Sequence, residues 1–287
     1  MKAHQYLYPI AVMSDVLNVS NSGYYAWLNR SPSARMLRDA LLTPHVQAAH
    51  EATRHTYGVQ RLHSELIAYG VIVTAYKVKV LRQRLGIYCK QKKRYKCTTN
   101  SQHDKVVAPN RLGQNFTVSR PNQVWVSDIT YVWTEAGWLY MAGIKDLFSC
   151  EMVGYAIGER MTAGLCLAAL QMAQLRRQPK TGLILHSDRG SQYCAKAYQK
   201  RLAQAGILAS MSRRGNCYDN APMESFWGSL KNELIHQTQY KTREEARDAI
   251  VEYVEVFYNR IRRHTKLGNR SPAEALRNFK LMQEELV

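Results

Sequence analysis

Residues 124–133 read VWVSDITYVW, and this run determines the class of fold. Its apolar side chains fall on both faces of an extended chain: Trp125, Ile129 and Tyr131 on one face, and Val126 and Val132 on the other. A strand that is apolar on both faces is typical of the centre of a sheet covered by helices. Asp128 lies in the middle of this run, where an ionised carboxylate is costly unless it is paired or binds a metal ion. We therefore take Asp128 as the first candidate functional residue.

The segments that follow predict the rest of the sheet. Strands are expected at 137–149, 150–159, 183–187 and 206–211, and helices at 162–177, 195–205, 220–236 and 242–260, the last of the chain. Three strands followed by alternating helices and strands predict an α/β fold, a mixed five-stranded sheet with helices on both faces.

Two further acids stand near the places where such folds bind ligands. Asp188 directly follows the buried run LILHS, at the carboxyl end of a strand. Glu224 lies in the first turns of a helix that begins near Asn220 and Pro222. Taken singly, Asp128 could pair with a buried arginine, Asp188 could belong to a turn, and Glu224 could stabilise its helix N-terminus. Together the three carboxylates can converge on two divalent cations, which prefer oxygen ligands.

The charge of the chain indicates a polyanionic partner. Of 40 basic and 22 acidic residues, residues 1–119 hold 17 and 5, which is +12 of the net charge of +18. Neutralised phosphates release counterions, and this release drives basic surfaces onto nucleic acid. The alternative is a basic protein that is merely soluble.

Nothing in the sequence predicts export or membrane insertion. There is no run of about eighteen apolar residues and no signal-peptide pattern. The six cysteines are scattered without a CxxC pair, which is typical of reduced thiols. We therefore expect a cytoplasmic protein that does not contact membranes.

The N-terminal part is expected to be helical and to bind DNA. Two short helices are predicted at 10–30, with Ser20 capping the second, then a longer helix at 34–53 and a helix–turn–helix unit at 57–87, with Thr74 capping its second helix. That second helix has a cationic solvent face made of Lys77, Lys79, Arg82 and Arg84. Such a face suits contact with a phosphate backbone. The alternative is a small helical bundle with a solvated basic face.

A basic linker is expected at 89–119. It begins with a cluster of Lys90, Lys92, Lys93, Arg94 and Lys96. No apolar periodicity follows, so we expect this linker to pack no core. The cluster would follow DNA phosphates, or the linker is simply flexible.

Three stretches around the acids resemble the signature blocks of one enzyme family. PNQVWVSDITYV, LHSDRGSQY and RGNCYDNAPMESFWGSLKNEL are similar to those of DDE transposases from bacterial insertion sequences, of the OrfB type that shares its catalytic core with retroviral integrases. The 35 residues between Asp188 and Glu224 fit that type. YGVQRLHSEL, SGYYAWLNR and RSPAEAL resemble its other parts, so the resemblance covers nearly the whole chain.

The resemblance implies a ribonuclease H-like fold and phosphoryl transfer with two metal ions. Asp128, Asp188 and Glu224 would hold two Mg²⁺ ions, which Mn²⁺ could replace. The site would cut a DNA strand and then join its 3′-OH to a new phosphodiester. Lys231, seven residues after Glu224 and therefore on the same helix face, would contact the DNA terminus.

The resemblance also implies partners and a place in the cell. The expected partner is double-stranded DNA, both terminal inverted repeats and target, bound by a homo-oligomer in the bacterial cytoplasm in association with the nucleoid. Enzymes of this type are usually made as a frameshift fusion with an upstream OrfA segment. No leucine zipper is present here, so two alternatives stay open: the OrfB product acting alone, or an OrfA segment as its partner or frameshift fusion.

The predicted domains follow from these parts. They are an N-terminal helix–turn–helix-like unit at 1–32, a helical DNA-binding domain at 33–88, the basic linker at 89–119, the ribonuclease H-like catalytic core at 120–237 and a C-terminal helical extension at 238–287.

Several residues near the acids leave alternatives open. His186 could touch the scissile phosphate or be a packed residue that supports the site from behind. Asn220 and Tyr218 could meet DNA or serve in local capping. Trp125 and Trp227 are expected in the core rather than as platforms for base stacking.

A zinc site is a weak alternative in the N-terminal part. His45, His50, Cys89 and Cys97 provide the His-His-Cys-Cys residue types of retroviral integrases. The two cysteines are eight positions apart, however, instead of the usual two to four intervening residues. We therefore do not expect structural zinc.

Two rival functions remain compatible with the sequence. One is a ribonuclease H-like nuclease that cuts without strand transfer, since water and a DNA 3′-OH are interchangeable nucleophiles. The other is a DNA-binding regulator of transposition with a decayed core, although all three carboxylates and Lys231 are present.

Overall fold

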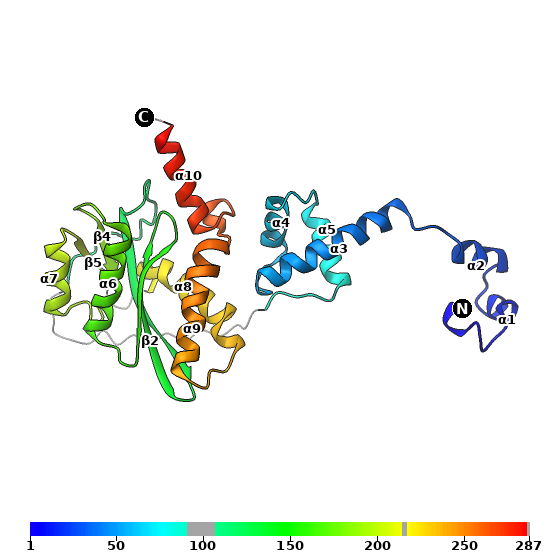
Figure 1. The fold of residues 1–287 in the computed structure, drawn as a ribbon, viewed down its shortest axis with the longest axis horizontal. Coiled ribbons are helices and arrows are strands. Elements are labelled where there is room, and N and C mark those ends of the chain that lie inside the picture. The colour runs from blue at the N-terminus through cyan, green and yellow to red at the C-terminus, as the bar shows by residue number, and fades with distance from the viewer. Residues whose placement is uncertain (91–106, 214–216, 286–287) are drawn as a thin grey trace.

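The computed structural model describes residues 1–90, 107–213 and 217–285. Figure 1 shows a pair of short helices, a helical unit and a larger α/β body in that order. The short turn η1 (Lys2–His4) precedes α1 (Ile10–Val16) and α2 (Asn21–Leu28), and the helical unit contains α3 (Ala34–Ala52), α4 (Val59–Ala68) and α5 (Ala75–Arg84). The predicted caps are confirmed, since the hydroxyls of Ser20 and Thr74 accept hydrogen bonds from Gly23 N and Lys77 N.

The prediction that all four basic residues of α5 form an unneutralised, exposed cationic face is wrong. Asp39, on α3, forms ion pairs with Lys77 at 2.6 Å and with Arg84 at 2.7 Å. Arg82 is buried, so Lys79 is the basic residue of the four that is exposed without an ion pair in the described structure. The reason is tertiary packing, because α3 supplies the acid that α5 lacks.

A five-stranded mixed sheet forms the α/β body, as predicted. Its strands are β1 (Val124–Thr134), β2 (Gly137–Asp146), β3 (Met152–Gly158), β4 (Ile184–Ser187) and β5 (Leu208–Met211), in the order β3-β2-β1-β4-β5. The first three strands are antiparallel, whereas β4 runs parallel to both β1 and β5. This is a ribonuclease H-like arrangement, and β1 lies at its centre.

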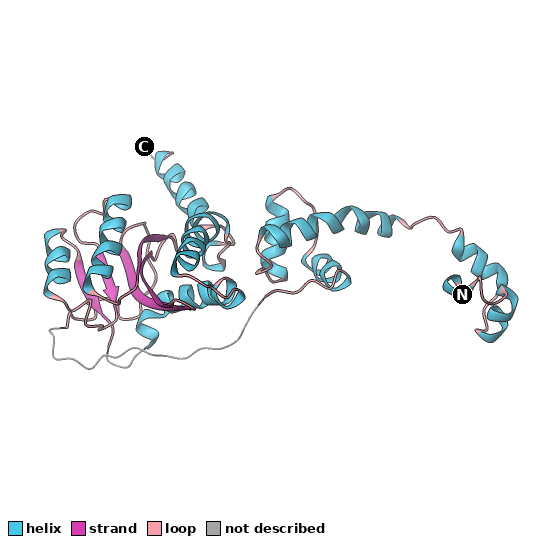
Figure 2. Ribbon diagram, turned by 60° about the horizontal axis from the view of Figure 1, so that its bottom comes forward, coloured by secondary structure: helices cyan, strands magenta, loops and turns pink. Residues whose placement is uncertain are grey.

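Helices cover both faces of the sheet (Figure 2). On one face α6 (Ala163–Arg177) and α7 (Lys196–Gln204) share a core with Trp125 and Leu185. On the other face α8 (Ala221–Glu233), α9 (Arg243–Glu252) and the π-helix η4 (Tyr253–Ile261) share a core with Val126. The close approach of α6 requires glycine at 154, because a Cβ there would collide with the Ala169 carbonyl.

The prediction that the last helix of the chain ends at residue 260 is wrong. After η3 (Ile235–Gln237), α9, η4 and η5 (Thr265–Leu267), a further helix α10 spans Pro272–Glu284. It begins with a capping box in which the Ser271 hydroxyl accepts from Glu274 N while the Glu274 carboxylate accepts from Ser271 N.

Part of the predicted linker packs against the α/β body. Leu112 is buried in its core, and Phe116 and Val118 pack beside it. The prediction that this linker packs no core is therefore wrong for residues 107–119, since isolated apolar side chains on an extended chain need no periodicity to be buried. Lys92, Lys93 and Arg94, predicted to meet DNA, lie outside the described residues.

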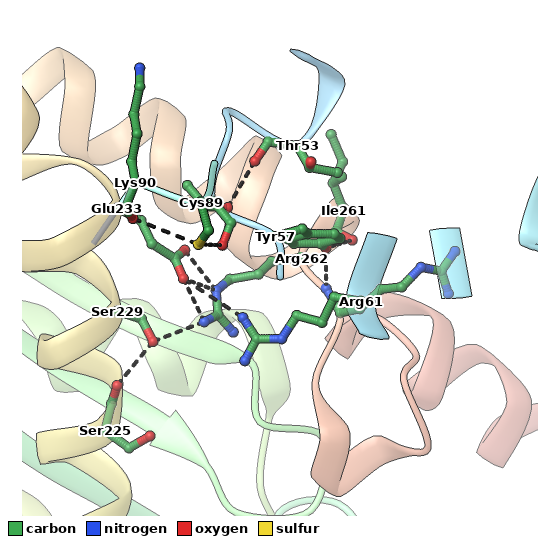
Figure 3. A network of polar contacts seen from close by, with 12 residues as sticks. Thr53, Tyr57, Arg61, Cys89, Lys90, Ser225, Ser229, Glu233, Ile261 and Arg262 are labelled. Carbon is green, nitrogen blue, oxygen red and sulfur yellow. Dashed lines mark hydrogen bonds and ion pairs between the residues drawn. The ribbon is translucent and has the colours of Figure 1, made fainter. Parts of the chain in front are cut away.

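The helical unit docks on the C-terminal helices. The Arg54 guanidinium lies over the Phe257 ring, 4.8 Å from its centroid, and forms an ion pair with Glu252. Figure 3 shows the guanidinium groups of Arg61, on α4, and Arg262, just after η4, both next to the Glu233 carboxylate. Within the described ranges, none of the helices has the length and apolar character needed to cross a bilayer.

Candidate active site

The pairing of β1 with β4 places Asp128 beside Asp188. Val126 pairs with His186 in parallel register, and each aspartate lies two residues further along its own chain. Since neighbouring strands lie about 4.8 Å apart, this register places Asp188, at the carboxyl end of β4, next to Asp128 in the middle of β1.

Asp128 accepts two hydrogen bonds but has no ion-pair partner among the described residues. Its Oδ1 accepts from the backbone N–H of Ile129 at 2.8 Å, and its Oδ2 accepts from the Trp227 indole N–H at 3.0 Å. Burial raises the pKa of Asp128 to about 8, and the charge of Asp188 adds to the rise, with a smaller contribution from Glu224.

Helix α8 presents Glu224, Trp227 and Lys231 along one face, because residues three and four apart are neighbours on a helix. The hydrogen bond from Trp227 fixes this face onto Asp128. Further along β1 and α8, the Lys231 ammonium lies 5.0 Å from the centre of the Tyr131 ring. Burial lowers the pKa of Lys231, while the charges of Tyr131 and Asp128 oppose this.

The start of α8 is fixed by an acid that takes no direct part in the site. Asp219 is fully buried and accepts hydrogen bonds from Arg213, from Gln114 at 2.7 Å and from Asn110 at 3.0 Å. The Arg213 guanidinium holds the pKa of Asp219 well below its usual range. Asp219 is therefore structural, and it ties residues of the predicted linker to the loop before Glu224.

The described acids do not by themselves form a closed metal-binding cage. Among the described residues, no three His, Cys, Asp or Glu side chains stand close enough together to hold an ion. The adjacent pair Asp128 and Asp188 nevertheless fits a divalent cation, because bound positive charge would offset the repulsion that raises the pKa of Asp128. Glu224 is on the α8 face that meets this pair.

Comparisons with known proteins agree with this geometry. Residues 118–217 and 205–272 match two families described as integrase core domain, and residues 36–95 match one described as HTH-like domain. The chain is 40% identical over 276 residues to "Transposase InsF for insertion sequence IS3A" of Escherichia coli (strain K12), covering 96% of each protein. The chain belongs to the transposases of bacterial insertion sequences.

A second relative and a solved structure are also similar to this transposase. The "Insertion element IS600 uncharacterized 31 kDa protein" of Shigella sonnei is 54% identical over 261 residues, which are 91% of this chain and 96% of that protein. The HTLV-2 integrase catalytic core domain in complex with magnesium has a TM-score of 0.42 and 14% identity, over 54% of this chain and 97% of that one.

His186 of the transposase is a packed residue. It is fully buried, with Nδ1 at 2.8 Å from the Ser210 hydroxyl and Nε2 at 3.1 Å from the Ser212 hydroxyl. Burial lowers its pKa to about 4. Of the two alternatives for His186, the structure therefore favours support of the site from behind over contact with a phosphate.

Asn220 is also buried in this structure, which argues against the predicted DNA contact. It is 6% exposed and occupies the N-cap position of α8, but its side chain does not cap the helix. Its Nδ2 instead donates to the Ser127 carbonyl at 3.2 Å, which binds the start of α8 to β1. Tyr218, two residues earlier, is 72% exposed.

The residues considered for zinc have other surroundings. The His50 ring is buried and stacks on His55, with ring centroids 4.7 Å apart. The Cys89 thiol lies 2.9 Å from the Thr56 carbonyl, and His45 is exposed. Cys97 lies outside the described residues.

Two residues of the site were missed at the sequence level. Trp227 was correctly expected in the core, since it is 5% exposed, but its hydrogen bond to Asp128 was not foreseen. Its position three residues after Glu224 was the available signal. Lys145 is buried in β2 and donates to the Pro222 carbonyl at 3.2 Å, and its signal was a lone base within an apolar strand.

Proposed function

We propose that this transposase binds the ends of its insertion sequence, cuts a DNA strand there and joins the freed 3′-OH to a new phosphodiester. One observation carries the proposal. Asp128 on β1 stands beside Asp188, which directly follows β4, and burial together with the charge of Asp188 raises the pKa of Asp128 to about 8. A buried acid of this kind, in a family of transposases, supports a metal-binding catalytic role.

Asp128, Asp188 and Glu224 would hold two Mg²⁺ ions, or Mn²⁺ in their place. When bound, these ions would activate the attacking oxygen and stabilise the leaving oxygen of the phosphodiester. Asp128 must lose its proton before it can act as a ligand. The Trp227 and Ile129 N–H groups orient its two oxygens, so both are already positioned when the proton leaves.

The nucleophile would come from outside the protein. Water would attack in the cutting step and the DNA 3′-OH in the joining step, so no serine or tyrosine nucleophile is required. Lys231, partly buried beside Tyr131, would contact a phosphate at the DNA terminus.

Binding of double-stranded DNA would fall to the helical unit. Lys79 offers an exposed charge on α5, and the basic cluster at the start of the linker would add further phosphate contacts. The protein would act as a homo-oligomer on the DNA, together with an OrfA segment as partner or fusion, in the bacterial cytoplasm and in association with the nucleoid.

One incubation tests the proposal. The purified protein is mixed with Mg²⁺ and a labelled element end, with an Asp188→Asn variant as the control. Joined strands from the wild type alone are the expected result. Cut strands without joining would identify a nuclease, and a mobility shift without cutting would identify a DNA-binding regulator; either result overturns the proposal.

A further inference from the structure

A large cavity opens beside Lys231, on the side away from the start of α8. Its volume is about 910 Å³, within the range of roughly 300–1,000 Å³ that is usual for ligand pockets. Its walls combine aromatic and basic side chains, among them Tyr131, Trp133, Trp138, Lys231, His236 and Tyr240.

The cavity exists because β1 extends beyond its parallel neighbour. β4 pairs with β1 only at Val124–Val126, so in the described structure the β1 edge beyond Asp128 has no strand beside it. The chain after α8 returns to the far end of this edge, where the Glu135 backbone N–H donates to the Tyr240 carbonyl at 3.0 Å. The hollow therefore runs along this edge from Tyr131 and Lys231 to the β1–β2 turn.

Two exposed indoles stand at this turn. Trp133 and Trp138 are a cross-strand pair, 58% and 43% exposed, with ring centroids 4.9 Å apart. The Tyr131 ring meets Trp138 edge to face at 5.1 Å. Paired exposed tryptophans leave apolar area in water, which is costly to the free protein and favours a bound flat partner.

The position of this aromatic group relative to Asp128 suggests its ligand. Tyr131 is three residues from Asp128 on the same strand, a distance of about 10 Å at the usual rise per residue. The Lys231 ammonium lies over the Tyr131 ring and also interacts electrostatically with Asp128. A row of aromatic rings next to an ammonium group is suited to binding a nucleotide, because the base can stack on a ring while the ammonium contacts the phosphate.

We propose that the cavity holds an unpaired nucleobase of the DNA strand engaged at the Asp128–Asp188 site, stacked on Trp133 and Trp138. The proposal rests on the proposed function and adds a preference for DNA ends that are frayed. Opening the last base pairs would let the strand reach the buried carboxylates, and the cavity would stabilise the opened form. A second copy of the chain is the competing occupant.

The experiment measures binding without Mg²⁺, so that its outcome does not depend on cleavage. The probe is a short duplex with an unpaired overhang that contains 2-aminopurine, and its control is the same duplex fully paired. Stacking on an indole quenches 2-aminopurine fluorescence. The wild type is expected to quench the overhang probe and to bind it about tenfold more tightly than the paired duplex.

Variants separate stacking from folding. Trp133→Ala and Trp138→Ala should lose the quenching and the tenfold preference, whereas Trp133→Phe should keep most of both. Leu175→Ala, at a residue 71% exposed on α6, is the matched control and should behave as the wild type.

Three results would overturn the proposal. They are a wild type without preference for the overhang, alanine variants that keep the preference, and a Trp133→Ala variant that changes the mass of the free protein in light scattering while DNA preference persists. The last result would assign the surface to a second copy. If the protein prefers the overhang probe but does not join strands, that result would count against the proposed function and not against this proposal.

Discussion

Two aspartates, one in the helical unit and one in the α/β body, differ in their ion pairing and in the direction in which their pKa is shifted. Asp39, in the helical unit, pairs with Lys77 and Arg84, and the hydrogen bond from Lys77 is the main reason that its pKa is lowered. Asp128, in the α/β body, has hydrogen bonds but no ion-pair partner in the described structure, and burial raises its pKa to about 8.

This comparison distinguishes charged residues that stabilise the fold through an ion pair from charged residues that are available to bind an external ligand. An acid with its counter-charge inside the chain stabilises the folded state and needs nothing from outside. An acid held without one destabilises the metal-free protein and is available to an external cation. The same distinction applies to bases on α5, where Lys77 is paired and Lys79 is exposed.

The largest effect is expected at the proposed metal ligands. Asp128→Asn, Asp188→Asn and Glu224→Gln should each lower DNA cutting and joining by a factor on the order of 10³ or more, because ion-assisted phosphoryl transfer loses several kcal/mol of stabilisation. DNA binding in gel-shift assays should stay close to wild type, since an amide keeps the shape of the acid. Asp39→Asn is the contrasting variant and should retain the chemistry. Substantial joining by any of the three amide variants would remove that residue from the site.

A buried ion pair at the junction should matter for stability alone. Arg262 and Glu233 have side chains only 5% and 9% exposed, so Glu233→Gln should cost about 3–5 kcal/mol by leaving the guanidinium without its counter-charge. Glu252→Gln is the matched control, because the Glu252 side chain is 51% exposed where it meets Arg54 and its loss should cost less than about 1 kcal/mol. Urea denaturation measures both. Equal losses would mean that burial does not distinguish these two pairs.

Lys231→Ala should lower the joining rate about tenfold, the usual weight of one charged hydrogen bond to phosphate. Lys231→Arg should retain part of the rate, and Lys196→Ala, an exposed lysine on α7, should retain all of it. Rates are compared at saturating Mg²⁺ alongside melting temperatures. A wild-type joining rate in Lys231→Ala would show that the proposed contact does not exist.

The smallest effect compares two lysines on α5. Lys79→Ala should lower the slope of log K against log salt by about 1 if it meets a phosphate. Lys77→Ala should change the slope less, because Asp39 already neutralises that charge. Titrations of one DNA duplex at several salt concentrations measure both slopes. Equal changes would mean that Asp39 releases Lys77 when DNA binds.

Local sequence patterns predicted those strands and helix ends that depend only on neighbouring residues. The apolar run around Asp128 predicted a central strand, and LILHS predicted the strand before Asp188, so their proximity followed from the parallel sheet. The start of α10 was equally readable from the Ser271 and Glu274 capping box but was not predicted.

What the sequence did not reveal depends on contacts between distant residues. Asp39 and Lys77 are 38 positions apart, so no window along α5 could indicate that its charges were matched. The hydrogen bond from Trp227 to Asp128 spans 99 positions. Burial of Leu112 likewise depends on a surface built by later elements.

The central claim is that Asp128 is destabilising until a cation binds, and thermal melting tests it most directly. An aspartate ionises near pH 4 in the unfolded chain, while the pKa of Asp128 in the folded protein is about 8. Between these values the folded state holds a proton that the unfolded state has lost, so each pH unit lowers stability by about 1.4 kcal/mol. Without Mg²⁺, Asp128→Asn should therefore melt above the wild type, by a margin that widens from pH 5 to pH 8. Adding Mg²⁺ at pH 8 should raise the melting temperature of the wild type but not of Asp128→Asn. A margin that does not change with pH, or an equal response of both proteins to Mg²⁺, would contradict the account.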